Sequence, residues 1–181
     1  IIIVLIMIPS FMAQRHNEFL YGSSCMHSEG SQVKNEADVI NGIFGQSQQM
    51  VLLVPEGDIV KEIALTEELS SVDEISSVVS YAGTVGALIP SDFLDEDTRS
   101  QFYSNGYSRM VITGAIADEG DEAFALTENI RSVAQSYYGE GYYLLGQNVV
   151  NYDLKETITN DYLPVTLASV IAIGLVLVIT F

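Results

Sequence analysis

Both ends of this chain are apolar and carry no charged residue. The C-terminal stretch, Leu163–Phe181, has close to the ~20 residues that a helix needs to cross a ~30 Å hydrocarbon core, so it predicts a membrane span. The N-terminal stretch, Ile1–Ala13, is too short to cross alone and lacks the basic region and cleavage site of a signal peptide. We interpret it as the second half of a spanning helix. We therefore expect an internal piece of a larger membrane protein, with a water-exposed domain between two membrane helices.

This pattern divides the chain into four parts. We expect a truncated transmembrane helix at 1–13, a polar connector at 14–30, an extracytoplasmic α+β domain at 31–161 and a transmembrane helix at 162–181 that is truncated at its end. The middle part has the length of one ordinary domain. Tyr162 stands where aromatic residues anchor helices at the membrane surface. Gly174 has no G-x-x-x-G partner, so helix pairing through that motif is unsupported.

The chain is strongly acidic. It has 7 Lys and Arg residues against 24 Asp and Glu residues, which gives a net charge of −17. Nucleic acids and anionic lipid headgroups repel such a surface and are normally bound by basic clusters, so neither is an expected partner. The scarcity of basic residues also favours an extracytoplasmic location. The single cysteine, Cys25, excludes a disulfide within the chain.

Short apolar runs and helical periodicity predict the elements of the domain. Strands are expected at Met50–Val54, Ile75–Tyr81, Tyr107–Ile116 and Tyr142–Gly146. Helices are expected from about Val33 to Gly45, over Ile59–Val72, near Phe93–Tyr103, from Ala123 to Tyr137 and over Val149–Tyr162. We expect a loop through Pro90 after the second strand, and Ser91 as a helix cap after that loop. The last helix is expected to continue into the membrane.

The order of these elements is βαββαβ, the split βαβ arrangement of ferredoxin-like folds. Such a unit has an antiparallel sheet with helices on one face only. The first strand, Met50–Val54, is apolar on both sides, so its second face is also expected to be covered. A neighbouring domain of the same protein or another subunit is the expected cover.

The residues that could carry chemistry lack the pattern of a working site. Asp92, Asp95, Glu96 and Asp97 lack the spacing of a calcium loop, and we interpret them as a solvated helix start. The same holds for Asp118, Glu119, Asp121 and Glu122. Cys25, Met26 and His27, with His16 nearby, offer soft metal ligands, but we interpret them as connector. No triad setting surrounds the histidines. We therefore expect no enzyme and no catalytic, cofactor-binding or metal-binding residue.

Tyrosines gather towards the end of the domain, at Tyr137, Tyr138, Tyr142 and Tyr143. Each ring is apolar with one polar tip, so the group could line a path for an amphiphilic molecule. The interpretation that we favour is that these rings pack a helix end against an edge strand.

The chain resembles the large extracytoplasmic loop of an MMPL-type transporter of the resistance-nodulation-division superfamily. The resemblance rests on the order membrane helix, acidic βαββαβ domain, membrane helix. It also rests on four strings, Ile43-Phe44-Gly45, Met50-Val-Leu-Leu-Val-Pro55, Phe93-Leu-Asp-Glu96 and Tyr107-Ser-Arg-Met110.

The resemblance implies a proton-driven membrane exporter of lipids or other hydrophobic molecules, in which this part forms a porter domain beside a homologous twin. In that family the proton is carried by acidic residues inside later membrane helices, and no such residue lies in the two apolar ends of this chain. Two alternatives remain open. One is an accessory subunit of protein translocation, and the other is the ligand-binding domain of a receptor with two spans.

Overall fold

The computed structural model describes residues 30–86 and 93–180. The span expected at 1–13, Cys25, His27, His16, Ser91 and Asp92 lie outside the described residues. The elements are α2 (Gln32–Phe44), β1 (Gln48–Pro55), α3 (Ile59–Ser70), β2 (Ile75–Val79), α4 (Tyr81–Thr84), α5 (Glu96–Phe102), β3 (Tyr103–Ser104), β4 (Tyr107–Gly114), α6 (Asp121–Tyr138), β5 (Tyr143–Gly146) and α7 (Gln147–Thr180).

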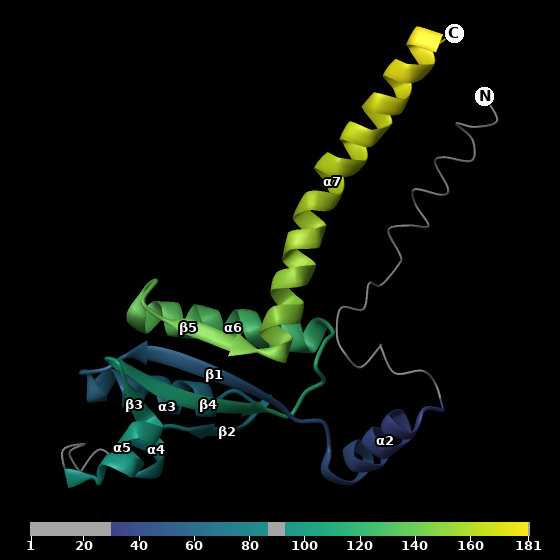
Figure 1. Ribbon diagram of the computed structural model, residues 1–181. Helices are drawn as coiled ribbons and strands as arrows, with labels where there is room; N and C mark the ends of the chain where they lie inside the picture. The colour runs from purple at the N-terminus through teal and green to yellow at the C-terminus, as the bar shows by residue number, and fades with distance from the viewer. Residues whose placement is uncertain (1–29, 87–92, 181) are drawn as a thin grey trace.

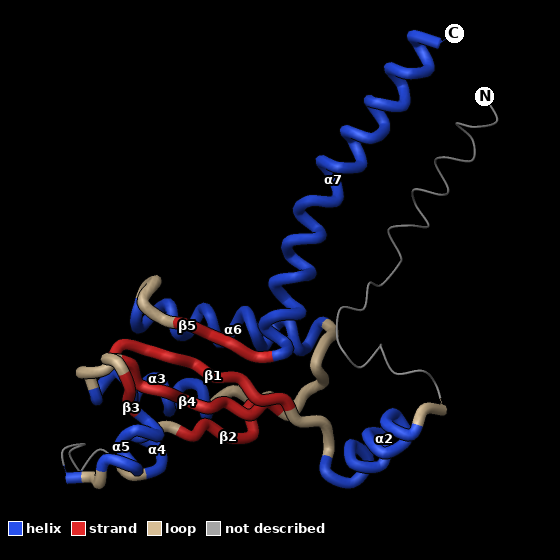
Figure 2. The backbone as a smooth tube through the Cα atoms, in the orientation of Figure 1, coloured by secondary structure: helices blue, strands red, loops and turns tan. Residues whose placement is uncertain are grey.

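The domain is a mixed α+β structure built on a five-stranded sheet (Figures 1 and 2). The strand order is β2-β4-β1-β5, and the short β3 pairs with β4. Every pairing is antiparallel. The α+β class predicted from the sequence is therefore confirmed. The central strands β1 and β4 are the longest, with 8 residues each, and buried residues alternate with more exposed ones along most of both strands.

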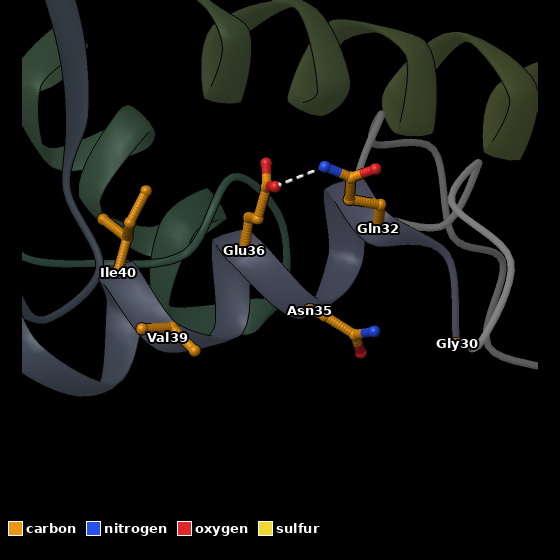
Figure 3. A pocket seen from close by; sticks show the side chains of 6 residues that line it. All are labelled: Gly30, Gln32, Asn35, Glu36, Val39 and Ile40. Carbon is orange, nitrogen blue, oxygen red and sulfur yellow. Dashed lines mark hydrogen bonds between the residues drawn. The ribbon is translucent and has the colours of Figure 1, made fainter.

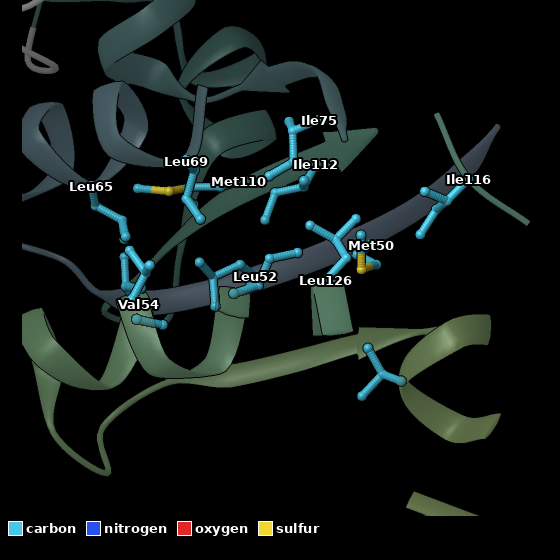
Figure 4. Packing of buried hydrophobic residues seen from close by; sticks show 14 of the residues in the cluster. Met50, Leu52, Val54, Leu65, Leu69, Ile75, Met110, Ile112, Ile116 and Leu126 are labelled. Carbon is cyan, nitrogen blue, oxygen red and sulfur yellow. The ribbon is translucent and has the colours of Figure 1, made fainter. Parts of the chain in front are cut away.

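The core lies between the sheet and the two helices α3 and α6 (Figure 4). From the sheet it receives the inward residues Met50, Leu52 and Val54 of β1, together with Met110 and Ile112 of β4. From the helices it receives Leu65, Leu69, Leu126, Ile130, Val133 and Ala134. The periodicity of α6 predicted this face, because its buried apolar positions recur every three or four residues.

Polar residues set the ends of the helices. Asp58 caps α3 by accepting a hydrogen bond from the Lys61 amide, 3.1 Å away. Asp95 caps α5 in the same way through the amide of Thr98, at 2.9 Å. A carboxylate at these positions satisfies amides that have no partner inside the helix. Gly45, at φ 79°, ends α2 where the sequence predicted the stop.

Three local expectations need correction. The predicted loop after β2 contains the short helix α4, because Ser80 accepts a hydrogen bond from the Gly83 amide and Tyr81 is buried. β3 was not predicted, because a two-residue strand has no periodicity to detect. The helical pattern of Ile59–Val72 also predicts Val60 at the margin of the apolar stripe of α3, but its side chain is 71% exposed.

Helix α7 leaves the domain directly after β5 and projects far beyond it (Figure 1). It runs unbroken for 34 residues with Pro164 inside it, as expected for a polar helix that continues into an apolar one. By length and composition it is the one helix in the described residues that could cross a membrane. Its apolar part is not buried inside the fold.

Candidate interaction face on the sheet

The sheet face opposite α3 and α6 carries an apolar row across its main strands. Val79 of β2 pairs with Val111 of β4, Val111 pairs with Val51 of β1, and Val51 pairs with Leu145 of β5. Leu145 is 66% exposed at the sheet edge. Side chains alternate between the two faces of a strand, so these residues point away from the core. We call this surface the open face.

The next two rows of the open face bring an aromatic pair together. Leu53 pairs with Tyr143, and Pro55 pairs with Tyr107. The rings of Tyr107 and Tyr143 meet edge to face, with centroids 5.7 Å apart. A hydrogen bond with Tyr143 and its negative charge when ionised raise the pKa of Tyr107 above its usual range. The pair presents amphipathic rings, each apolar with one polar tip, a surface suited to apolar or amphiphilic partners.

One cation, Arg109, lies in the row of Leu53 and Tyr143, in register with Leu53. Its side chain is exposed. Among the described residues, four other cations have a carboxylate within 4.0 Å, namely Lys61, Arg99, Arg131 and Lys155. No such ion pair forms at Arg109 within the same residues. Arg109 is therefore a positive point available to a partner, on a chain that is otherwise strongly acidic.

The tyrosines expected to cluster are divided between the two sides of the sheet. Tyr137 and Tyr142 pack against the core, and the Tyr137 hydroxyl donates to Glu68 Oε2 at 2.6 Å. Tyr138 also packs there, and burial raises its pKa to about 12. Tyr143 lies on the open face, 61% exposed. The group as a whole therefore does not line one path, and the packing interpretation fits Tyr137, Tyr138 and Tyr142.

No protein-family model matches this chain, and no curated protein matches it. The candidate site therefore rests on the geometry of the described residues.

Two members of the acidic clusters make contacts within the domain, Asp95 and Asp121. Asp95 accepts bonds from both the amide and the hydroxyl of Thr98, which lowers the pKa of its carboxyl. Asp121 lies 3.7 Å from the Lys155 ammonium. Within residues 30–86 and 93–180, no three His, Cys, Asp or Glu side chains come together as a metal site would require.

A buried carboxylate, Glu62, is the polar feature that the sequence did not reveal. It lies on α3 and is 1% exposed. Its Oε2 accepts hydrogen bonds from Tyr103 Oη at 3.0 Å and Ser108 Oγ at 2.9 Å. Burial raises the pKa of Glu62 above its ordinary value, the two hydroxyls oppose this, and the charges of Glu56 and Asp58 add to it. Glu62 thus joins α3 to β3 and β4 beneath the sheet.

Helix α7 is fixed to the domain by its first turns. Val149 and Asn151 are buried, and Asn151 donates to the carbonyl of Asp118 at 2.8 Å. Arg131 of α6 forms an ion pair with Asp153 at 2.8 Å and lies over the ring of Tyr152. The Lys155 ammonium lies 4.2 Å from the centre of the Phe124 ring. A displacement of α7 would therefore be passed to α6 and to the core beneath it.

Proposed function

We propose that this chain is the extracytoplasmic porter domain of a proton-driven exporter of hydrophobic or lipid-like molecules. The observation that carries the proposal is α7. Its start is buried in the domain, and it continues without a break into an apolar segment long enough to span a membrane. A continuous helix of this kind can couple movement in the membrane to movement of the domain outside it.

The finer description of the fold belongs to the same proposal. The strand order β2-β4-β1-β5, with α3 and α6 as the intervening helices, supports a ferredoxin-like βαββαβ unit with α2, α4, α5 and the small β3 added. We propose that the unit lies between two spans of a multi-pass cell-membrane protein. The second span would be the apolar end of the chain, and the first would include 1–13.

The open face is the proposed meeting surface with a second, homologous domain. Val51, Val111 and Leu145 supply apolar area, and the Tyr107–Tyr143 pair supplies amphipathic rings. Residues of these kinds are enriched at the buried centres of protein interfaces. Rocking of the two domains would open and close a cleft for the hydrophobic substrate. The proposal includes no cofactor, no nucleic-acid partner and no enzymatic step.

Export itself provides the test, in vesicles that contain the whole transporter. Thr157 is exposed and lies in α7 between the domain and the apolar segment. Thr157→Pro removes an amide from the helix ladder and bends the helix, whereas Thr157→Ala keeps the helix intact. We expect the proline variant to lose proton-gradient-driven export of a lipophilic dye, with its domain still folded, and the alanine variant to retain export.

Equal export by the two variants would contradict coupling through α7. If both variants still export the dye and the protein also binds unfolded polypeptide, the protein-translocation alternative is favoured instead.

A further inference from the structure

Helix α2 has an apolar stripe without a cover in the described structure. None of its residues is buried, and Ile40, Ile43 and Phe44 are 56%, 68% and 82% exposed. The helix lies apart from the sheet, beyond the end where β1 begins (Figure 1). An amphipathic helix is normally stabilised by burial of its apolar side. The stripe on α2 therefore requires a docking surface.

One carboxylate interrupts this stripe. Glu36 precedes Ile40 by four residues, and Figure 3 shows Gln32, Glu36 and Ile40 projecting to the same side of the helix. Glu36 accepts a hydrogen bond from the Gln32 amide group at 2.8 Å. A hollow of about 600 Å³ lies along the helix and is lined in part by Glu36, Val39 and Ile40. A docking surface for this stripe must be apolar with a cation at one point.

The open face has that composition. Beside its apolar row lies Arg109, in register with Leu53, and Arg109 has no carboxylate within 4.0 Å among the described residues. We propose that α2 docks on the open face of its own domain as a tethered lid, with Glu36 paired to Arg109. This inference concerns one chain and does not depend on the proposed function.

The spacing along the two elements agrees. From Ile40 to Glu36 a helix advances by about 6 Å, at about 1.5 Å per residue. From Val51 to Leu53 a strand advances by about 6.6 Å, at about 3.3 Å per residue. If α2 lies antiparallel to β1 with Ile40 over Val51, then Glu36 lies over Leu53, the register partner of Arg109. Ile43 then lies towards Gln49, at the end of the strand to which α2 is joined.

The connection between the two elements is long enough for this position. Gly45, Gln46 and Ser47 separate α2 from β1, so the Cα atoms of Phe44 and Gln48 can lie up to about 14 Å apart. That exceeds the ~10 Å that separates packed layers. Connections of two to six residues between a helix and a strand are common.

A second copy of the chain is a poorer occupant of the open face. Strands β1, β2, β4 and β5 contain no Asp or Glu. Two open faces placed against each other would therefore bring Arg109 to a surface without a carboxylate. Helix α2 offers both the apolar stripe and the missing charge, at an effective concentration set by the short tether. A twin domain or substrate would have to displace it.

Thiol cross-linking within the full chain in membrane vesicles tests the docking. In a Cys25→Ser background, Ile40→Cys/Val51→Cys places one thiol on the stripe and one on the open face. The control Ile40→Cys/Glu67→Cys places the second thiol on the exposed side of α3. With a short bismaleimide, we expect a cross-link within one chain for the first pair and not for the control. Labelling with a monofunctional maleimide shows that all three thiols are reachable.

Charge variants test the pairing of Glu36 with Arg109. We expect Glu36→Arg or Arg109→Glu to reduce the yield of the Ile40–Val51 cross-link about two- to fivefold, the effect of a partly exposed ion pair. The double variant should restore it. Equal cross-linking in the control pair, a cross-link only between chains, or no cross-link with reachable thiols would each overturn the lid. Single charge variants without effect would overturn the Glu36–Arg109 pairing.

Discussion

Glu62 is the residue at which a single substitution tests the energetics of the fold most sharply. Two buried hydroxyls, those of Tyr103 and Ser108, donate to its Oε2 at 3.0 Å and 2.9 Å. In Glu62→Ala both hydroxyls lose their acceptor, and each buried, unpaired hydroxyl costs about 1–3 kcal/mol. We therefore expect Glu62→Ala to lower the free energy of unfolding by about 2–5 kcal/mol.

Glu62→Gln separates the charge from the hydrogen bonds. The amide oxygen can accept from both hydroxyls, but it cannot ionise. Since burial raises the pKa of Glu62 in the folded protein, the folded state binds the proton more tightly than the unfolded chain does. The stabilisation that comes from this tighter proton binding is complete below the ordinary pKa of 4.5. It is lost as the pH rises through the pKa of Glu62 in the folded protein. The Gln variant should therefore gain stability relative to the native chain between pH 4 and pH 8.

Urea unfolding of the chain in detergent micelles measures both effects. The chain has 10 Tyr and no Trp, so tyrosine fluorescence and near-ultraviolet circular dichroism report on the core around Tyr103. Glu67→Gln, on the exposed side of the same helix, controls for the change of net charge. The measured quantity is the free energy of unfolding of Glu62→Gln minus that of the native chain. If this difference stays constant or falls as the pH rises, the reasoning is refuted, because the hydrogen bonds from the two hydroxyls would then affect the pKa of Glu62 more than burial does.

Three further substitutions, one of them with a matched control, have expected outcomes in the same unfolding assay. Gly146→Ala places a Cβ 2.7 Å from Met50 Cγ and 3.1 Å from the Gln49 carbonyl, so a loss of about 1–3 kcal/mol is expected; Gly174→Ala, with nothing within 4 Å, should change little. Leu52→Ala empties a fully buried position between sheet and helices and should cost about 2–5 kcal/mol. Asp95→Ala removes the cap of α5 and should cost about 1 kcal/mol, with faster hydrogen exchange at the Thr98 amide as its local sign.

Local patterns predicted the regular elements well, because burial in this fold follows the helix and strand periods. The inward set Met50, Leu52 and Val54 alternates as a strand requires, and the buried positions of α6 recur on one helical face. The short helix α4 after β2 was harder to predict. The turn of helix at Tyr81 depends on burial of its ring against Tyr103, 5.1 Å away between centroids, and that contact is made by residues distant in sequence.

The polar features of the site depended on contacts that no local pattern contains. Glu62 shares the helical face of Leu65, Thr66 and Leu69, but a carboxylate is normally exposed, so residue type alone argued against its burial. Its burial is possible because Ser108, 46 residues later, donates to it. The open face was predicted as a surface that needs a cover, but the register that brings Arg109 beside Leu53 and Tyr143 comes from strand pairing. The continuity of α7 with the apolar segment was predicted, whereas its attachment through Arg131 and Lys155 was not.

The most direct test of the exporter proposal is to determine the protein sequence that precedes residue 1 and the sequence that follows residue 181. The proposal predicts further membrane spans, a second acidic α+β domain of the same kind, and carboxylates in the middle of later membrane helices. Those carboxylates would be the residues to substitute in the export assay. A protein with only two spans, followed by a soluble cytoplasmic signalling module, would contradict the exporter and identify the domain as the ligand-binding part of a receptor.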